Sequence, residues 1–248
     1  MSDVLVIQSH RSPLPASWYR QCIDSVEAWA ASWGFAYRWL DDALFDPLPA
    51  QIREKTARQS VVAADLGRLY ALQAALAEGY DCAVWVDADT LVLDPLALAL
   101  ADTGHAFGRE IWVQETAGKL KVYRKIHNAF MVFRQGDPVL AFYLFAAQCL
   151  VRRHDGPMVP QLIGPKFLTM LHNVIDFPVL EMAAMLSPAV IDDLLGRKSA
   201  ALQRFKQASE VPPAAVNLSG SMVATGRLTD ADMAAVIELL QREPELLG

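Results

Sequence analysis

The stretch CAVWVDADTLV, residues 82–92, decides how the rest of this 248-residue chain is interpreted. Its first five residues are apolar without alternation, which predicts a strand buried on both faces of a parallel sheet. Asp87 and Asp89 follow where that strand should end, and ligands of open α/β sheets bind beyond the carboxyl ends of the strands. Two carboxylates together with phosphate oxygens are typical of a Mg2+ or Mn2+ site. The alternative is a strand end whose Asp residues cap the next turn.

Composition narrows the class of protein. Hydrophobic residues make up 53% of the chain, enough for a sizeable core, and the net charge of -6 argues against a general nucleic-acid binder. The three cysteines, at positions 22, 82 and 149, form no Cys-x-x-Cys pair, which favours a reduced protein. The N-terminus lacks a signal peptide, and no apolar run reaches the roughly 20 residues of a membrane span. We therefore expect a cytoplasmic protein without a transmembrane segment, and leave open peripheral association with the inner face of the membrane.

The first strand, residues 4–7, leads into a polar loop that contains Gln8 and Arg11. This loop leaves the sheet at its ligand end, so its donors are candidates for binding a nucleotide base or phosphate; the alternative is a solvated loop. The next helix is expected at residues 17–33, with a buried face that includes Trp18, Trp29 and Trp33.

A second helix is expected at residues 56–78, and it carries Asp65 at the edge of its apolar stripe. An unpartnered carboxylate near the core is costly, so Asp65 needs a partner. That partner is Arg68, three residues on, or a ligand hydroxyl. The alternative is an ordinary surface ion pair between Asp65 and Arg68.

Further candidates occur later in the chain. Asn128 opens an apolar strand, and Gly164 precedes a Pro at the start of a helix whose free N–H groups would attract an anion beside Lys166. One helix is expected at 189–207, and a late strand at 214–218 contains Asn217.

Taken in order, these motifs resemble the GT-A glycosyltransferases with an Asp-x-Asp sugar-binding region, of the mannosyltransferase-like and capsular-polysaccharide type. The resemblance runs from Val4 to Ser221. It implies that Asp87 and Asp89 bind metal and diphosphate. Many relatives have a His at the late strand as a third metal ligand. Here Asn217 stands in that place, and its amide oxygen is a weaker ligand.

The same resemblance implies the roles of the remaining candidates. Asp65 and Arg68 would contact the donor sugar, and Asn128 would bond donor-sugar hydroxyls. Gly164 and Lys166 would approach the diphosphate, together with Gln8 and Arg11 from the first loop.

We therefore expect one GT-A-like (nucleotide-diphospho-sugar transferase) α/β domain over residues 1–248. Its central sheet should be mostly parallel, with helices on both faces and a partly antiparallel insertion near residues 106–133. The expected reaction moves a sugar from a UDP- or GDP-sugar to a hydroxyl of a saccharide or glycan acceptor, with retention and with Mn2+ or Mg2+ as cofactor. Double displacement would need a group such as Asp65, Asn128 or Asp155 beside the anomeric carbon, whereas front-face attack needs none.

Two other functions compete with this one. A haloacid-dehalogenase-type phosphatase also uses two Asp residues after a buried strand, but its Thr stands two positions past the second Asp, whereas Thr90 follows Asp89 directly. A domain of the same GT-A-like fold could also bind a sugar nucleotide, or serve as a scaffold, without turnover. The Asn at position 217 keeps that alternative open.

Overall fold

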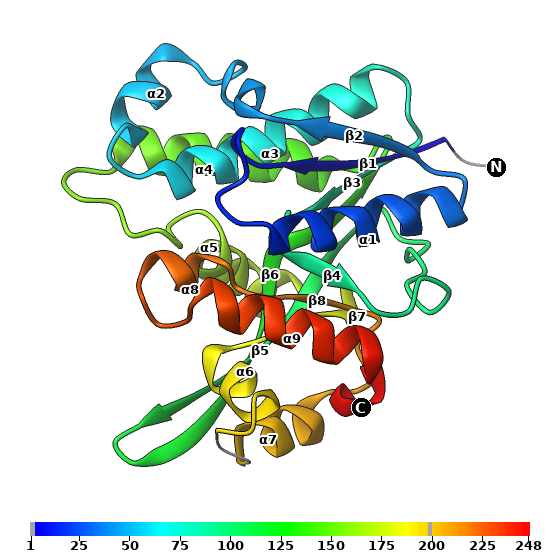
Figure 1. Ribbon diagram of the computed structural model, residues 1–248. Coiled ribbons are helices and arrows are strands. Elements are labelled where there is room, and N and C mark those ends of the chain that lie inside the picture. The colour runs from blue at the N-terminus through cyan, green and yellow to red at the C-terminus, as the bar shows by residue number, and fades with distance from the viewer. Residues whose placement is uncertain (1–2, 198–199) are drawn as a thin grey trace.

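The computed structural model describes residues 3–197 and 200–248 (Figure 1). The described strands form one eight-stranded sheet in the order β2-β1-β3-β6-β5-β7-β8-β4. The strands are β1 Val4–Ser9, β2 Ala36–Leu40, β3 Cys82–Val86, β4 Thr90–Val92, β5 His105–Thr116, β6 Lys119–Arg134, β7 Val179–Met185 and β8 Ala215–Asn217.

The sheet contains both parallel and antiparallel strand pairings. Among the described strands, β1 pairs in parallel with β2 and with β3, and β7 pairs in parallel with β5 and with β8. The remaining three pairings, β3–β6, β5–β6 and β4–β8, are antiparallel. The predicted mostly parallel sheet with an antiparallel insertion is confirmed, since four of these seven pairings are parallel and β5–β6 is the insertion.

Helices cover both faces of the sheet, as the sequence predicts. Because successive side chains of a strand point to opposite faces, Leu5 and Ile7 of β1 pack on the side of α3 and α4, while Val4 and Val6 pack on the side of α1. The helices are α1 Trp18–Ser32, α2 Ala50–Thr56, α3 Ser60–Ala77, α4 Pro138–Arg153, α5 Pro165–Ile175, α6 Pro188–Leu194, α7 Ala200–Ala208, α8 Ser221–Ala224 and α9 Asp230–Arg242, with short 3-10 turns η1 Asp42–Phe45 and η2 Pro244–Leu247.

The β5–β6 hairpin extends beyond the rest of the sheet (Figure 1). Its turn, Ala117-Gly118, has positive φ at both residues, which suits the twist of a two-residue hairpin. Asn128, expected at the opening of an apolar strand, instead lies within β6, which runs from Lys119 to Arg134 without a break.

Three other boundaries differ from prediction. The helix expected at 56–78 begins at Ser60, after a separate α2. The helix expected at 189–207 is divided into α6 and α7; Gly196 has a φ of +75° past the end of α6, and residues 198–199 of the expected helix lie outside the described residues. Trp33 is 40% exposed rather than buried, because α1 ends before it and its indole N–H donates to the Pro95 carbonyl. No helix within residues 3–197 and 200–248 is long and apolar enough to span a bilayer.

Candidate functional site

Asp87 lies directly after β3, at the edge of the sheet where the parallel strands β1 and β3 end. Its backbone N–H donates to the Ala129 carbonyl over 2.8 Å, which carries the β3–β6 pairing one residue past the strand. Its Oδ1 accepts a hydrogen bond of 2.6 Å from the Trp85 indole N–H. Antiparallel pairing with β6 therefore brings Asn128 beside the first Asp of the motif.

Arg68 joins the acidic residues of this site. The guanidinium of this buried residue of α3 lies 3.3 Å from Asp65 Oδ1 and 3.1 Å from Asp87 Oδ1. It also donates to the Asn128 carbonyl over 2.8 Å, and its Cζ lies 5.3 Å from the centre of the Trp85 ring. The predicted pairing of Asp65 with Arg68 is confirmed, and the pair is buried rather than on the surface.

Asp65 also forms a hydrogen bond with Asn128. The Asn128 side-chain N–H donates to Asp65 Oδ1 over 2.8 Å, while Asp65 Oδ2 is buried without a hydrogen-bond partner in the described structure. Burial raises the pKa of Asp65 to about 6, and this effect outweighs the opposing influence of Arg68 and Asn128. The backbone of Gly164 closes over the pair, since a Cβ there would lie 2.9 Å from Asp65 Oδ2. The enclosed Asp65 carboxylate thus keeps one oxygen, Oδ2, that accepts no hydrogen bond within the described structure.

Asp89 is held by the late part of the chain. Its Oδ1 accepts from the Asn217 side-chain N–H over 2.5 Å, and its Oδ2 accepts from the Gly220 backbone N–H over 2.7 Å. These contacts arise because β4 pairs with β8 and places Thr90 opposite Asn217. The pKa of Asp89 is raised to about 6, chiefly by desolvation and then by the charge of Asp87.

Asn217 is brought next to Asp89, as expected of a shared metal ligand, but its oxygen is turned away. The amide oxygen accepts the Ser219 backbone N–H over 2.9 Å, and the amide nitrogen faces Asp89. Flipping the amide would set its N–H2 against the Ser219 N–H, so the hydrogen-bond network fixes this orientation. In this arrangement Asn217 supports Asp89 and offers no oxygen beside it.

Asp87 and Asp89 themselves suit a divalent cation. Both carboxylates keep some exposure to solvent, whereas Asp65 is only 2% exposed. Carboxylate oxygens accept more than one contact, so the bonds from Trp85 and Gly220 leave capacity for a cation. Within the described residues no cluster of three or more His, Cys, Asp or Glu side chains is placed to hold a metal. A cation here would thus have these two carboxylates as its protein ligands.

The remaining candidates divide into two groups. Gln8 is buried and donates to the Asp87 carbonyl over 3.2 Å, while its own oxygen accepts from the Tyr37 hydroxyl. It therefore supports the turn after β3. Arg11 and Lys166 are exposed and stand outside the hydrogen-bonded cluster in the described part of the chain.

Sequence reasoning missed two donors at this site. Trp85 was interpreted as one apolar residue of a buried strand, although its position two residues before Asp87 puts both side chains on one side of the chain. Gly220 contributes a backbone N–H, which leaves no trace in side-chain chemistry. Its distance of 131 residues from Asp89 hides the contact from any local pattern.

Comparisons with known proteins give distant structural neighbours. A scan of protein-family models and a search of curated proteins gave no match. A glycosyltransferase involved in glycosylation of the major capsid of PBCV-1 superposes with a TM-score of 0.45 at 12% identity, over 95% of this chain and 98% of its own. The galactosyltransferase LgtC, in complex with donor and acceptor sugar analogues, gives 0.40 at 14% identity over 95% of each chain. Mouse xyloside xylosyltransferase 1 in its apo form gives 0.47 at 11% identity, over 89% of this chain and 99% of its own. With TM-scores below 0.5, these similarities carry no conclusion about chemistry.

Proposed function

We propose that this chain is a glycosyltransferase that moves a sugar from a UDP- or GDP-sugar to an acceptor hydroxyl. The observation that carries the proposal is the pair of partly exposed carboxylates, Asp87 and Asp89, at the carboxyl end of β3. Each is fixed by donors of its own chain, Asp87 by Trp85 and Arg68, and Asp89 by its late-chain partners. The Asp-x-Asp resemblance assigns this arrangement to donor binding.

The charge of the site supports a cation cofactor. When ionised, Asp65, Asp87 and Asp89 carry three negative charges against the single positive charge of Arg68 in the same cluster. An anionic diphosphate would be repelled by that excess. Mn2+ or Mg2+ on Asp87 and Asp89 would balance it, and when bound would supply charge stabilisation for the leaving diphosphate. The exposed Arg11 and Lys166 are the sequence's candidates for additional contacts to phosphate.

Asp65 and Asn128 are the proposed catalytic residues. Their hydrogen bond orients both side chains, and Asp65 Oδ2 has acceptor capacity that nothing in the described chain uses. A donor-sugar hydroxyl would fill it once the segment around Gly164 moves aside. Retention follows from the resemblance. It fits either front-face attack, in which Asp65 and Asn128 orient the sugar, or double displacement, in which one of them reaches the anomeric carbon.

A second function is favoured by one observation. Asn217 turns its nitrogen toward Asp89, which is the orientation that serves a structural contact. A GT-A-like domain that binds a sugar nucleotide, or acts as a scaffold, without turnover would need no more than this. Metal-stimulated hydrolysis of a sugar nucleotide in the absence of acceptor would exclude that alternative.

The test is a thermal-shift series with UDP, GDP, UDP-glucose, UDP-galactose and GDP-mannose, each with and without Mn2+. A ligand at one hundred times its dissociation constant adds about 2.7 kcal/mol of stability. We expect a metal-dependent shift with one nucleotide class, lost in Asp87→Asn and kept in the control Asp46→Asn, which alters an exposed carboxylate elsewhere. A shift that is the same without metal and in Asp87→Asn would remove the cation from the proposal. No shift with any nucleotide would overturn it entirely.

A further inference from the structure

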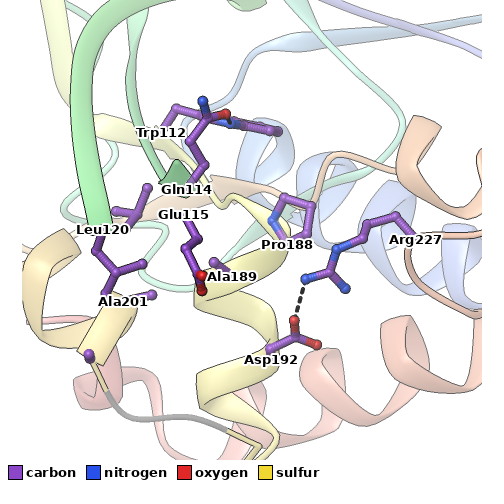
Figure 2. A pocket seen from close by; sticks show the side chains of 11 residues that line it. Trp112, Gln114, Glu115, Leu120, Pro188, Ala189, Asp192, Ala201 and Arg227 are labelled. Carbon is purple, nitrogen blue, oxygen red and sulfur yellow. Dashed lines mark hydrogen bonds and ion pairs between the residues drawn. The ribbon is translucent and has the colours of Figure 1, made fainter. Parts of the chain in front are cut away.

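A second site of a different kind lies between the β5–β6 hairpin and the helices α6 and α7. It is a cavity of about 610 Å³, within the range of roughly 300–1,000 Å³ typical of small-molecule sites. Figure 2 shows its wall, with Trp112 and Gln114 from β5 on one side and Pro188 and Asp192 from α6 on the other. None of the acidic residues of the candidate site lines it.

Two hydrogen bonds link the segment that holds Asp89 to the wall of this cavity. Ser219 lies between the two Asp89 partners, and its hydroxyl donates to the Leu186 carbonyl over 2.9 Å. The next residue, Ser187, donates to the carbonyl of Val113, which lines the cavity, over 2.7 Å. The segment that starts at Gly220 beside Asp89 reaches the cavity again at Arg227, seven residues later. The backbone segments that position Asn217, Ser219 and Gly220 beside Asp89 therefore also contact the wall of the cavity.

The lining combines apolar surface with a few polar groups. Trp112 is half-buried in the wall, and its indole N–H donates to Gln114 Oε1 over 3.0 Å, which fixes the ring. The Gln114 amide nitrogen donates to Thr116 Oγ1 over 3.5 Å and so keeps a second N–H. Asp192 and Arg227 form an ion pair on the α6 side of the cavity, drawn as the dashed line in Figure 2. Sugars match such a lining, because a pyranose presents an apolar C–H face and a rim of hydroxyls. The mixture of one aromatic plane with convergent polar groups suits a ligand with both.

The charges of the lining argue against the other ligand classes. The Arg227 guanidinium is already paired with Asp192, so the cavity has no excess positive charge to hold a phosphate. A lipid chain would remove water from the Asp192–Arg227 ion pair and from the Gln114 amide without offering new hydrogen bonds, which is costly. An uncharged saccharide avoids both penalties.

We propose that this cavity binds the acceptor saccharide, with Trp112 as its stacking platform. The proposal rests on the proposed function, since it supplies the second substrate for transfer at the neighbouring site. It places the acceptor between the hairpin and α6.

The experiment is an NMR titration of the indole N–H resonances with the methyl glycosides of glucose, galactose, mannose and N-acetylglucosamine. We expect saturable shifts of the Trp112 resonance with at least one glycoside. In the Trp112 variants, which lack that resonance, backbone amide resonances of β5 report binding, and Trp112→Ala should bind at least tenfold more weakly. Trp112→Phe keeps an aromatic plane and should retain most of the affinity. The matched control is Trp39→Ala, because Trp39 is 36% exposed on β2, at the far end of the sheet. If no glycoside shifts Trp112, or if Trp112→Ala binds as tightly as Trp39→Ala, the proposal is overturned.

The same samples separate this proposal from the proposed function. Asp87→Asn should lose the nucleotide thermal shift and keep glycoside binding at Trp112. Glycoside binding without any nucleotide shift would refute the donor site and leave a saccharide cavity, whereas a nucleotide shift without glycoside binding would refute the cavity alone. A native thermal unfolding curve for Trp112→Phe guards against a variant that has merely failed to fold.

Discussion

The side-chain nitrogen of Asn217 lies 2.5 Å from Asp89 Oδ1, although 128 residues separate the two in sequence. Together with the Gly220 backbone N–H, this contact gives each oxygen of Asp89 a donor from the chain itself. The orientation of Asp89 is therefore set by the protein in the absence of any bound group. Both the stability and the chemistry of the site depend on that arrangement.

Replacing Asn217 by Ala should destabilise the protein by about 1–2 kcal/mol at pH 7, because a partly buried carboxylate oxygen loses its donor. The measurement is urea unfolding. The control is Asn173→Ala, which alters an exposed Asn on α5 and should leave the free energy of unfolding within about 0.5 kcal/mol of wild type. Equal effects of the two substitutions would contradict the assigned role. If Asp89 holds a cation, Mn2+ should recover more stability in Asn217→Ala than in Asn173→Ala.

Replacing Arg68 by Ala should cost about 3–5 kcal/mol, since it leaves Asp65 as a buried charge without its cation. Arg38→Ala is the matched control, because Arg38 and Glu78 form a partly exposed ion pair worth at most about 1 kcal/mol. Arg68→Lys should fall between them, since Lys keeps the charge and loses the planar fork that reaches both Asp65 and Asp87. Chemical denaturation of the three variants tests this order. Similar losses of unfolding free energy in Arg68→Ala and Arg38→Ala would contradict the role assigned to Arg68.

Stability should depend on pH through Asp65. Burial raises its pKa in the folded state to about 6, from 3.8 as an ordinary Asp. The folded state therefore binds the proton more tightly, so this group stabilises the fold at low pH. That contribution is lost as the pH rises from about 4 to about 6. Asp65→Asn lacks this titration, so the difference in unfolding free energy between variant and wild type should move in favour of the variant by roughly 2 kcal/mol between pH 4 and pH 7. A difference that stays flat across this window would show that Asp65 titrates normally.

Gly164→Ala should disturb the Asp65–Asn128 pair. The new Cβ would lie 2.9 Å from Asp65 Oδ2 and 3.0 Å from Asn128 Nδ2, so it would crowd both side chains. We expect a loss of about 1–3 kcal/mol in stability. The thermal shift with a sugar nucleotide should fall more than the shift with the bare nucleotide. A double-mutant cycle with Asn128→Ala checks the cause, because removing the crowded amide should make the two effects non-additive. Strict additivity would place the strain elsewhere.

Patterns of a few consecutive residues predicted those parts of the site whose geometry depends on residues near in sequence. The apolar run before Asp87 gave a buried strand, and the position of Asp65 on the stripe of α3 indicated a buried partner, found in Arg68. The prediction that Trp33 is buried is wrong, because the apolar periodicity of the helix extends to Trp33, whereas Gly34 turns the chain there with a φ of +69°. The orientation of Asn217 and the cavity beside Trp112 could not be predicted, since both depend on strands and loops far apart in sequence.

The long sequence separation between Asp89 and its partners has a consequence for biosynthesis. A ribosome releases this chain from the N-terminus, so Asp65, Arg68 and Asp87 can meet when little more than the first half has emerged. Asp89 must wait for residues 217–220, which are made 128 to 131 residues after it. Contacts of such large separation form slowly. A nascent chain would thus have the contacts of Arg68 with Asp65 and Asp87 in place while Asp89 still lacks its partners. A product truncated before β8 would lack the Asp89 contacts altogether.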